Sequence, residues 1–232
     1  MRLGLCALGL GAILSAGCGG QNKTAAVPPS VSTSVQRSLD PGLDAVTRMI
    51  GAARARDRVA LWSLLSDRAQ RRLGPTLPDF RKTGARQLER RVRNLSRNGL
   101  HEVVSDRITG KFGVVAVASG RRVFAAPLRF EHGSWRMELG RGRLAIRVVG
   151  PDVGSVTRVQ QIAFEIHGAP GGATAILYAD GVNLRSREAV AGGSATVYAN
   201  LESPLTRGRH TAVAFATDGD AAVARAWTFV AR

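Results

Sequence analysis

Few side chains in this sequence are spaced to do chemistry. The four histidines, His101, His132, His167 and His210, are scattered, and none stands within helical reach of a second histidine or of a carboxylate pair. The sequence has no His-x-x-x-His metal spacing, no Gly-x-Ser-x-Gly nucleophile elbow and no Walker phosphate loop. We therefore expect no metal ion, no cofactor and no catalytic residue.

Cys18 is the residue whose surroundings best indicate a modification. Met1-Arg2 supplies a positive charge, and residues 3–14 are apolar or glycine, which is typical of a secretory leader. At about 12 residues this run is too short to span about 30 Å of hydrocarbon as a helix.

The small residues Ser15-Ala16-Gly17 directly before Cys18 resemble the bacterial lipoprotein signal, although Ser15 stands where leucine is commonest. The resemblance implies that the leader, residues 1–17, is removed and that the Cys18 thiol is acylated. We then expect a cell-membrane location, anchored by lipid on the extracytoplasmic face. The alternative is an ordinary cleaved leader followed by an incidental cysteine.

Residues 18–40 lack hydrophobic periodicity and contain Pro28-Pro29, which predicts a flexible tether. A flexible segment of this length spans roughly 25 Å. The other cysteine, Cys6, lies in the leader, so we expect no internal disulfide and no thiolate metal site. The folded part must then hold together by packing alone.

The charge is strongly positive and unevenly distributed. The net charge is +16, and residues 42–140 hold 20 basic and nine acidic side chains, against 10 and seven in residues 141–232. A basic chain can attract nucleic acid, but an exported chain would rarely meet it. Aromatic residues make up only 5% of the sequence, which is few for base stacking. We therefore expect no nucleic-acid partner.

Helical periodicity begins after Asp40-Pro41, where apolar residues recur at three- and four-residue spacing. We expect a first helix there. A second should be capped by Asp57 and run to about Leu73-Gly74-Pro75. A third is expected over residues 79–98.

The third predicted helix carries a basic stripe. At 100° per residue, its cations fall within an arc of about 80°. They are Lys82, Arg86, Arg90, Arg93 and Arg97. This is either a solvated outer face or a binding surface for anionic lipid head groups or an anionic envelope polymer. Near an anionic leaflet, each arginine contributes about 1 kcal/mol.

The period changes to two after Asn98-Gly99, which predicts four strands, at residues 101–109, 113–118, 121–131 and 134–139. Residues 41–140 are therefore expected to form an α+β domain. The runs Leu61-Trp62-Ser63-Leu64-Leu65-Ser66 and Phe130-Glu131-His132-Gly133-Ser134-Trp135-Arg136-Met137 resemble the cone-shaped nuclear transport factor 2-like (SnoaL-like) family. That family includes enzymes, ligand-binding cones and structural domains, so the resemblance does not select a function.

A cone of this kind can enclose a cavity, and Asp79, Glu102 and Asp106 are the acids best placed to face it. A buried carboxylate there could act as a base. The sequence offers such a carboxylate no catalytic partner, so we do not expect an enzyme.

Residues 141–232 are rich in Val, Ala, Ile and Thr, with glycine-containing turns. Seven strands are expected, at residues 144–149, 161–167, 173–179, 183–189, 194–201, 210–217 and 222–230, which predicts an all-β sandwich. The run from Leu205 to Gly219, with Leu-x-x-Gly-x-His before a strand and an Asp-Gly turn after it, resembles bacterial immunoglobulin-like domains. Such domains are commonly spacers or adhesion modules of envelope proteins.

We expect a non-catalytic, lipid-anchored cell-envelope protein that acts as a binding or assembly module. The alternative is a small-molecule-binding or catalytic cone exported to the cell surface. A ligand cone needs an open apolar pocket, whereas a structural cone fills its interior with side chains such as Trp62, Phe80, Phe124 and Trp135.

Overall fold

The computed structural model describes residues 41–93, 95, 99–139, 142–168, 173–191 and 194–232. The predicted leader, the predicted tether, Cys18 and Arg97 therefore lie outside the described residues. All of the described residues belong to one compact unit.

Within these residues the chain forms five helices, where the sequence predicted three. They are α1 (Pro41–Ala55), α2 (Arg58–Ser63), α3 (Asp67–Leu73), α4 (Leu77–Lys82) and α5 (Gly84–Arg93). The predicted cap at Asp57 is confirmed, because its side chain accepts a hydrogen bond from the backbone nitrogen of Ala60.

The prediction of one continuous second helix was wrong, because residues 64–66 pair with a strand instead. Leu65 forms a parallel bridge with Met137, whose nitrogen donates to the Leu64 carbonyl at 2.9 Å. Ser66 then caps α3, since its hydroxyl oxygen accepts from the Ala69 nitrogen at 3.1 Å. This pairing holds the start of α3 beside residue 137.

The predicted third helix is also divided. The Thr83 hydroxyl donates to the carbonyls of Leu73 and Asp79 where α4 ends. Gly84 begins α5 so close to Leu73 that a Cβ would lie 2.6 Å from the Leu73 carbonyl oxygen. The prediction of a single helical stripe was therefore wrong, because Lys82 ends α4 whereas Arg86 and Arg90 lie on α5.

The four predicted strands of the first domain are confirmed. They are β1 (His101–Arg107), β2 (Phe112–Ser119), β3 (Arg122–Glu131) and β4 (Ser134–Met137), an antiparallel sheet in the order β1-β2-β3-β4. His132 and Gly133, with φ of 51° and 73°, join β3 to β4. Two successive positive φ values are what a tight two-residue hairpin turn requires.

The rest of the described chain forms a β-sandwich, as predicted. One sheet has the order β10-β11-β7-β5, and the other β6-β13-β12-β8-β9. Their bounds are β5 (Ala145–Gly150), β6 (Val156–Thr157), β7 (Gln161–His167), β8 (Thr174–Ala179), β9 (Val182–Leu184), β10 (Arg187–Ala191), β11 (Ser194–Asn200), β12 (Gly208–Thr217) and β13 (Ala222–Ala231). The strand predicted at residues 183–189 is in fact β9 and β10, which belong to different sheets, and β6 was not predicted.

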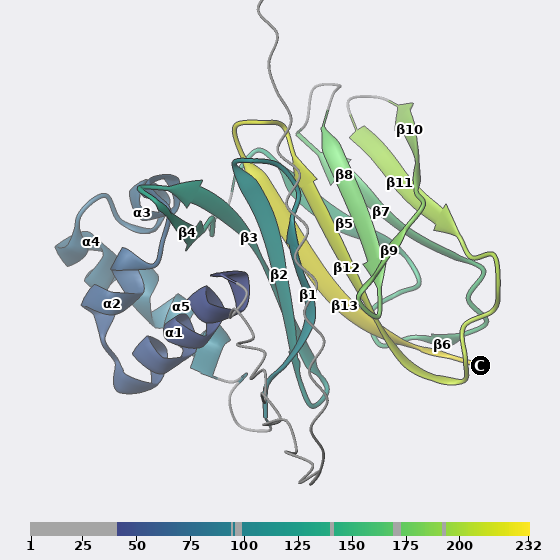
Figure 1. The fold of residues 1–232 in the computed structure, drawn as a ribbon, viewed down its shortest axis with the longest axis horizontal. Helices are drawn as coiled ribbons and strands as arrows, with labels where there is room; N and C mark the ends of the chain where they lie inside the picture. Colours follow the sequence, from purple (N-terminus) through teal and green to yellow (C-terminus); the bar gives the residue numbers. More distant parts are fainter. Residues whose placement is uncertain (1–40, 94, 96–98, 140–141, 169–172, 192–193) are drawn as a thin grey trace, which may run out of the picture. The chain divides into compact units, whose positions relative to one another are not determined.

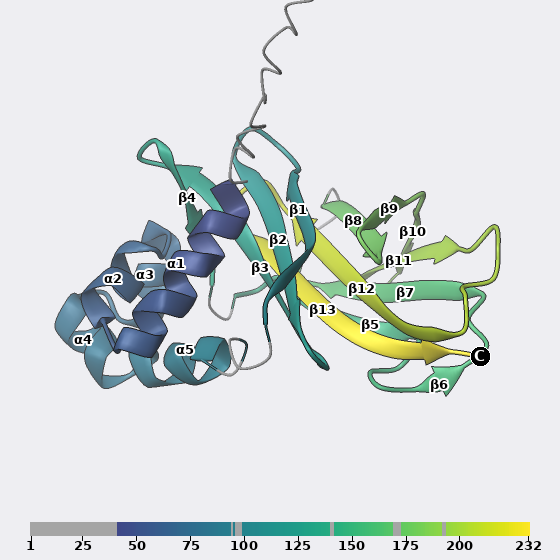
Figure 2. The ribbon, with the colours of Figure 1, turned by 60° about the horizontal axis from the view of Figure 1, so that its bottom comes forward.

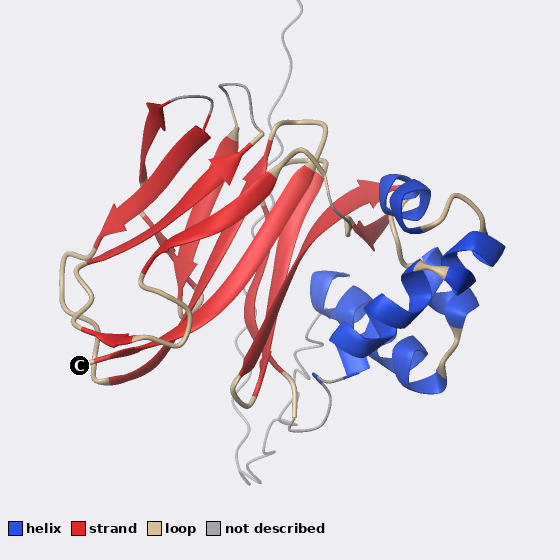
Figure 3. Cartoon of the chain, turned by 180° about the vertical axis from the view of Figure 1, so that it is seen from behind, coloured by secondary structure: helices blue, strands red, loops and turns tan. Residues whose placement is uncertain are grey.

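Both faces of the β1–β4 sheet are covered (Figures 1 and 2). Val115 and Val117 on one face belong to the core shared with the helices. On the other face, Val114 packs in a core with Val213 and Phe215 of β12. The strand β2 is consequently buried along its entire length. Figure 3 shows the same arrangement from behind, with the helices on one side of the strands.

The space between the helices and the sheet is filled by side chains. Phe80 is fully buried, and its ring centroid lies 5.4 Å from that of Trp62. Phe124 and Met137 are also buried in this core, and Trp135 packs against it. These residues include the four that the sequence analysis assigned to the interior of a structural cone.

Candidate functional site

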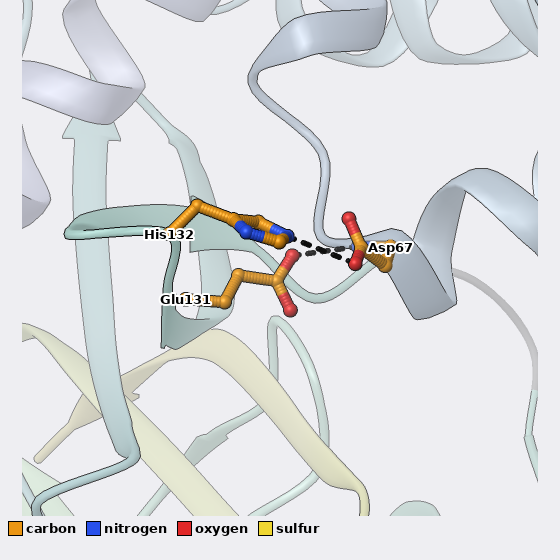
Figure 4. Close-up of side chains that lie close together, drawn as sticks. All are labelled: Asp67, Glu131 and His132. Atoms are coloured by element: carbon orange, nitrogen blue, oxygen red, sulfur yellow. Dashed lines mark hydrogen bonds and ion pairs between the residues drawn. The ribbon is translucent and has the colours of Figure 1, made fainter.

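Asp67, Glu131 and His132 lie together, although Asp67 is far from the other two in the sequence (Figure 4). The His132 Nε2 lies 3.0 Å from the Asp67 Oδ2, and the backbone nitrogen of Asp67 donates to the Glu131 Oε1 at 2.6 Å. One potential ligand atom from each side chain lies within 4.8 Å of the others. We call these residues the acid–histidine cluster.

The pairing of Leu65 with Met137 brings this cluster together. It places Asp67, the first residue of α3, beside the turn that carries His132. Glu131 is the last residue of β3, so it reaches the same point from the sheet.

The charges around the cluster are mostly positive. The hydrogen bond with His132 lowers the pKa of Asp67 below its ordinary value, and the charges of His132, Arg136 and Arg71 act in the same direction against the effect of burial. The Arg136 Nη1 lies 3.9 Å from the Asp67 Oδ1. Carboxylates and an imidazole can bind a divalent metal ion. Here such an ion would have to displace the His132 bond and face the charges of Arg71 and Arg136.

A pocket of about 500 Å³ adjoins the cluster and shares two residues with it. We call it the arginine pocket. Its lining consists of Asp67, Arg68, Arg71, Arg72, Arg129, Glu131 and Asp220. These residues come from α3, from β3 and from the turn between β12 and β13, so both halves of the described chain contribute.

Buried Glu138 holds two of the arginines. Its Oε2 accepts hydrogen bonds from the Ser66 hydroxyl at 2.6 Å and from the Arg129 Nε at 3.0 Å. Its Oε1 lies 3.7 Å from the Arg68 Nε and makes no hydrogen bond to the described residues. The carboxylate of Glu138 therefore serves both Arg68 and Arg129.

Asp220 holds the same two arginines from the sandwich. The Arg68 Nη1 donates to its carboxylate Oδ2 and to its backbone oxygen, both at 2.6 Å, and the Arg129 Nη2 donates to the same backbone oxygen. The hydrogen bond from Arg68 is the main cause that lowers the pKa of Asp220, and the positive charges of Arg68, Arg129 and Lys111 act in the same direction. Arg68 and Arg129 are thus fixed from two sides.

The other two arginines of the pocket are differently placed. Arg71 and Arg72 lie in the last turn of α3, and both are exposed. Neither makes a hydrogen bond or ion pair with any residue in the described part of the chain. Among the described residues, the pocket therefore combines two fixed guanidinium groups with two that have no hydrogen-bond or ion-pair partner.

The acids proposed for a cone cavity have other positions. Asp79 accepts a hydrogen bond from the Thr76 hydroxyl at 2.6 Å at the start of α4. Glu102 is exposed on β1. Asp106 accepts from the Tyr178 hydroxyl at 2.7 Å, on the side of the sheet that faces the sandwich. Burial, together with this bond, raises the pKa of Tyr178 well above its ordinary value. The expectation that Asp106 faces the cone cavity was therefore wrong.

The predicted binding residues are only partly described. Cys18 and Arg97 lie outside the described residues, and the side chain of Arg93 does too. Lys82, Arg86 and Arg90 are exposed.

The arginine pocket was not predicted from the sequence. The spacing of Arg68, Arg71 and Arg72 places them on one face of a helix and was an available local signal. The contributions of Arg129 and Asp220 depend on contacts across the fold.

No protein-family model and no curated protein matches the sequence. Among solved structures, the chain is similar to PcoC, a methionine-rich copper resistance protein from Escherichia coli, at 16% identity and a TM-score of 0.31, over 39% of this chain and 100% of that one. It is similar to titin domain M4 at 18% identity and a TM-score of 0.29, over 39% of this chain and 94% of that one. The two-sheet sandwich described above is defined by its own strand pairing.

The helices that the structure describes include none that is long and apolar enough to cross a membrane.

Proposed function

We propose that this protein is a non-catalytic, lipid-anchored module of the bacterial cell envelope that binds or assembles other envelope components. Residues 1–17 would be removed as a leader, Cys18 would carry the acyl chains, and residues 18–40 would tether the folded part. Residues 41–140 would be a nuclear transport factor 2-like domain, and residues 141–232 an immunoglobulin-like sandwich.

The observation that carries this proposal is the filled interior between the helices and the sheet. A ligand-binding or catalytic cone needs an open apolar cavity with a few convergent polar groups. Here Phe80 and Met137 are fully buried in the position where such a cavity would lie, together with Phe124. This packing favours a structural cone over a cone that binds a small molecule or catalyses a reaction.

The use of the acidic side chains also supports a non-catalytic role. Asp79 accepts a hydrogen bond from the helix cap Thr76, Asp106 binds Tyr178, and Glu138 holds Arg68 and Arg129. A general base must be able to take a proton from a substrate. These three carboxylates are instead occupied by contacts within the fold.

The shared core between the two domains suits a module that presents a surface at a distance from the membrane. A tether spanning roughly 25 Å would let a single folded body reach the anionic head groups or an anionic envelope polymer. The exposed side chains of Lys82, Arg86 and Arg90 are available for that contact. The contributions of Arg93 and Arg97 remain predictions from the sequence.

The test is mass spectrometry and membrane fractionation of the full chain beside the Cys18→Ser variant. The proposal expects a diacylglyceryl-type mass on Cys18 of the wild type, and release of the variant from the membrane. Cys6→Ser is the matched control, because it removes the other thiol from within the leader and should change neither result. An unacylated wild type, or a Cys18→Ser variant that stays at the membrane, would contradict the proposal.

A further inference from the structure

The arginine pocket has no role in the anchoring and spacing described above, and we infer that it binds a phosphate group carried by an envelope component. This inference rests on the proposed function for the location of the ligand. It does not depend on lipidation for the chemistry of the pocket.

The pocket holds two arginines in a fixed arrangement before any ligand arrives. Glu138 and the backbone oxygen of Asp220 bind Arg68 and Arg129, and only 24% and 11% of these two side chains is exposed. A side chain that is already ordered loses little conformational entropy when it binds a ligand. The Arg129 guanidinium also lies over the Phe112 ring, 4.8 Å from its centroid, which fixes it further.

Arg71 and Arg72 supply donors that the described part of the chain leaves unused. They are exposed, and no partner for either lies in the ranges that the structure describes. A Cβ added at Gly142 would lie 2.8 Å from the Arg72 Nη2, so this guanidinium group lies close against the backbone of Gly142. Two guanidinium groups whose donors have no partner among the described residues therefore reach a pocket of about 500 Å³.

The unused donors of the pocket favour an anion as the ligand. Four guanidinium groups line the pocket with three carboxylates, and Glu138 pairs with two of these guanidinium groups, so the formal charges balance. Each of these carboxylates already has a hydrogen-bond partner. Asp67 pairs with His132, Glu131 accepts from the Asp67 nitrogen, and Asp220 accepts from Arg68. A cation would have to compete for these oxygens, whereas an anion would meet unused donors. The net charge of +16 also attracts anions to the surface.

The arrangement of the donors favours phosphate among anions. A guanidinium group offers a planar fork of donors that matches two oxygens of a phosphate group. Arg71 and Arg72 lie in the last turn of α3, and the fixed guanidinium groups of Arg68 and Arg129 line the pocket beside them. A tetrahedral anion has oxygens pointing in several directions, which suits this geometry. A water molecule occupies about 30 Å³ in the liquid, and the pocket volume of about 500 Å³ is many times larger. The pocket therefore also has room for the organic group that bears the phosphate.

The experiment measures binding by the full chain in nonionic detergent, with two probes. The first is inorganic phosphate, titrated by calorimetry. The second is detergent micelles doped with phosphatidylglycerol, compared with micelles doped with phosphatidylcholine. Binding of free phosphate would assign the site to soluble phosphorylated groups, and binding of phosphatidylglycerol micelles alone would assign it to lipid head groups. Either result supports the inference.

The Arg71→Gln/Arg72→Gln variant should weaken binding by about tenfold, since each lost bond is to a charged group. Both side chains are exposed and make no hydrogen bond or ion pair with the described residues, so the variant should unfold close to the wild-type temperature. Arg121→Gln/Arg122→Gln is the matched control. It removes a second exposed pair of adjacent arginines, and it should change the affinity by less than about twofold.

Two results would overturn the inference. One is the absence of saturable binding to both probes. The other is an equal loss in the pocket variant and the control, which would mean that the net charge alone attracts the anion. The assay in detergent does not require an acyl chain, and the fractionation of Cys18→Ser does not require the pocket. Failure of this inference is therefore distinguishable from failure of the proposed function.

Discussion

The Asp220 carboxylate accepts a hydrogen bond of 2.6 Å from the Arg68 guanidinium group, although the two residues are 152 positions apart. Asp220 lies in the turn between β12 and β13, and Arg68 lies on α3. The bond therefore joins the sandwich to the helical layer at the arginine pocket. Because the Asp220 side chain is 82% exposed, this ion pair contributes little stability by itself. The apolar core between the β1–β4 sheet and the sandwich sheet that contains β12 must therefore supply most of the stability of this junction.

Replacing Phe215 should destabilise both halves of the protein. Phe215 is fully buried where β12 packs against the β1–β4 sheet, so Phe215→Ala would leave a cavity between them. We expect a loss of about 3–5 kcal/mol in the free energy of unfolding, measured by urea denaturation. Val190→Ala, at a side chain that is 66% exposed, should change it by less than about 0.5 kcal/mol. If the loss at Phe215 is no larger than the loss at Val190, β12 does not pack against the β1–β4 sheet as described.

Glu138→Gln should be costly because it removes the negative charge that buried Arg129 and partly buried Arg68 contact. We expect a loss of about 3 kcal/mol in the free energy of unfolding, since breaking one side of a buried ion pair leaves the other uncompensated. Glu188→Gln, at an exposed position of β10, is the control and should leave the free energy of unfolding almost unchanged.

A double-mutant cycle checks the cause of that loss. Glu138→Gln/Arg129→Gln should cost at least about 1 kcal/mol less than the sum of the two single variants, because the second change removes the unpaired charge. Strictly additive losses would show that Glu138 does not act through Arg129.

The stability of the sandwich should fall as the pH rises through the range where His210 loses its proton. The His210 Nδ1 lies 2.6 Å from the Asp180 carboxylate and the Nε2 lies 2.7 Å from the Thr206 carbonyl. Both partners only accept hydrogen bonds, so both ring nitrogens carry protons. Burial acts to lower the pKa of His210, but the bonds to Asp180 and Thr206 and the charge of Asp180 outweigh it and raise the pKa.

Because the folded-state pKa is the higher one, this stabilisation is complete below the unfolded value of about 6.5 and is lost as the pH rises through the folded value. Urea denaturation from about one unit below to two units above 6.5 should show the decline. The decline should persist in His101→Gln, whose side chain is exposed, and disappear in His210→Gln. A wild-type stability that is level or rises over this interval would refute the assignment.

The acid–histidine cluster should not act as a zinc site. An ion would have to displace the bond between His132 and Asp67 and approach Arg71 and Arg136. We expect micromolar zinc to leave the unfolding temperature unchanged in both the wild type and the His132→Ala variant. A rise in the wild type that is lost in His132→Ala would instead identify the cluster as a metal site.

Local features of the fold were predictable from the sequence, whereas features set by distant contacts were not. The hairpin at His132-Gly133 follows from the residues that form the turn, and the first four strands were predicted accordingly. The break before α3 was not predictable, because it depends on the pairing of Leu65 with Met137. The alternation along the first sheet also gave no sign that its second face would be covered by β12.

The candidate site shows the same limit. Arg68, Arg71 and Arg72 are close in sequence, but Arg129 joins them from another element. Asp220 joins only because the sandwich packs against the first sheet. Composition predicted a basic half of the molecule but could not predict which of its cations would share a pocket.

The central claim is that the helical layer and the sandwich form one body, on which the arginine pocket depends. The most direct test follows urea unfolding of the full-chain Trp62→Phe/Trp135→Phe variant with two probes. Far-UV circular dichroism reports the helices, and fluorescence reports Trp227, the remaining tryptophan, which is buried in the sandwich. If the two parts form one body, both signals should change in a single coincident transition. Two separate transitions would show that the halves unfold independently, and would contradict the central claim.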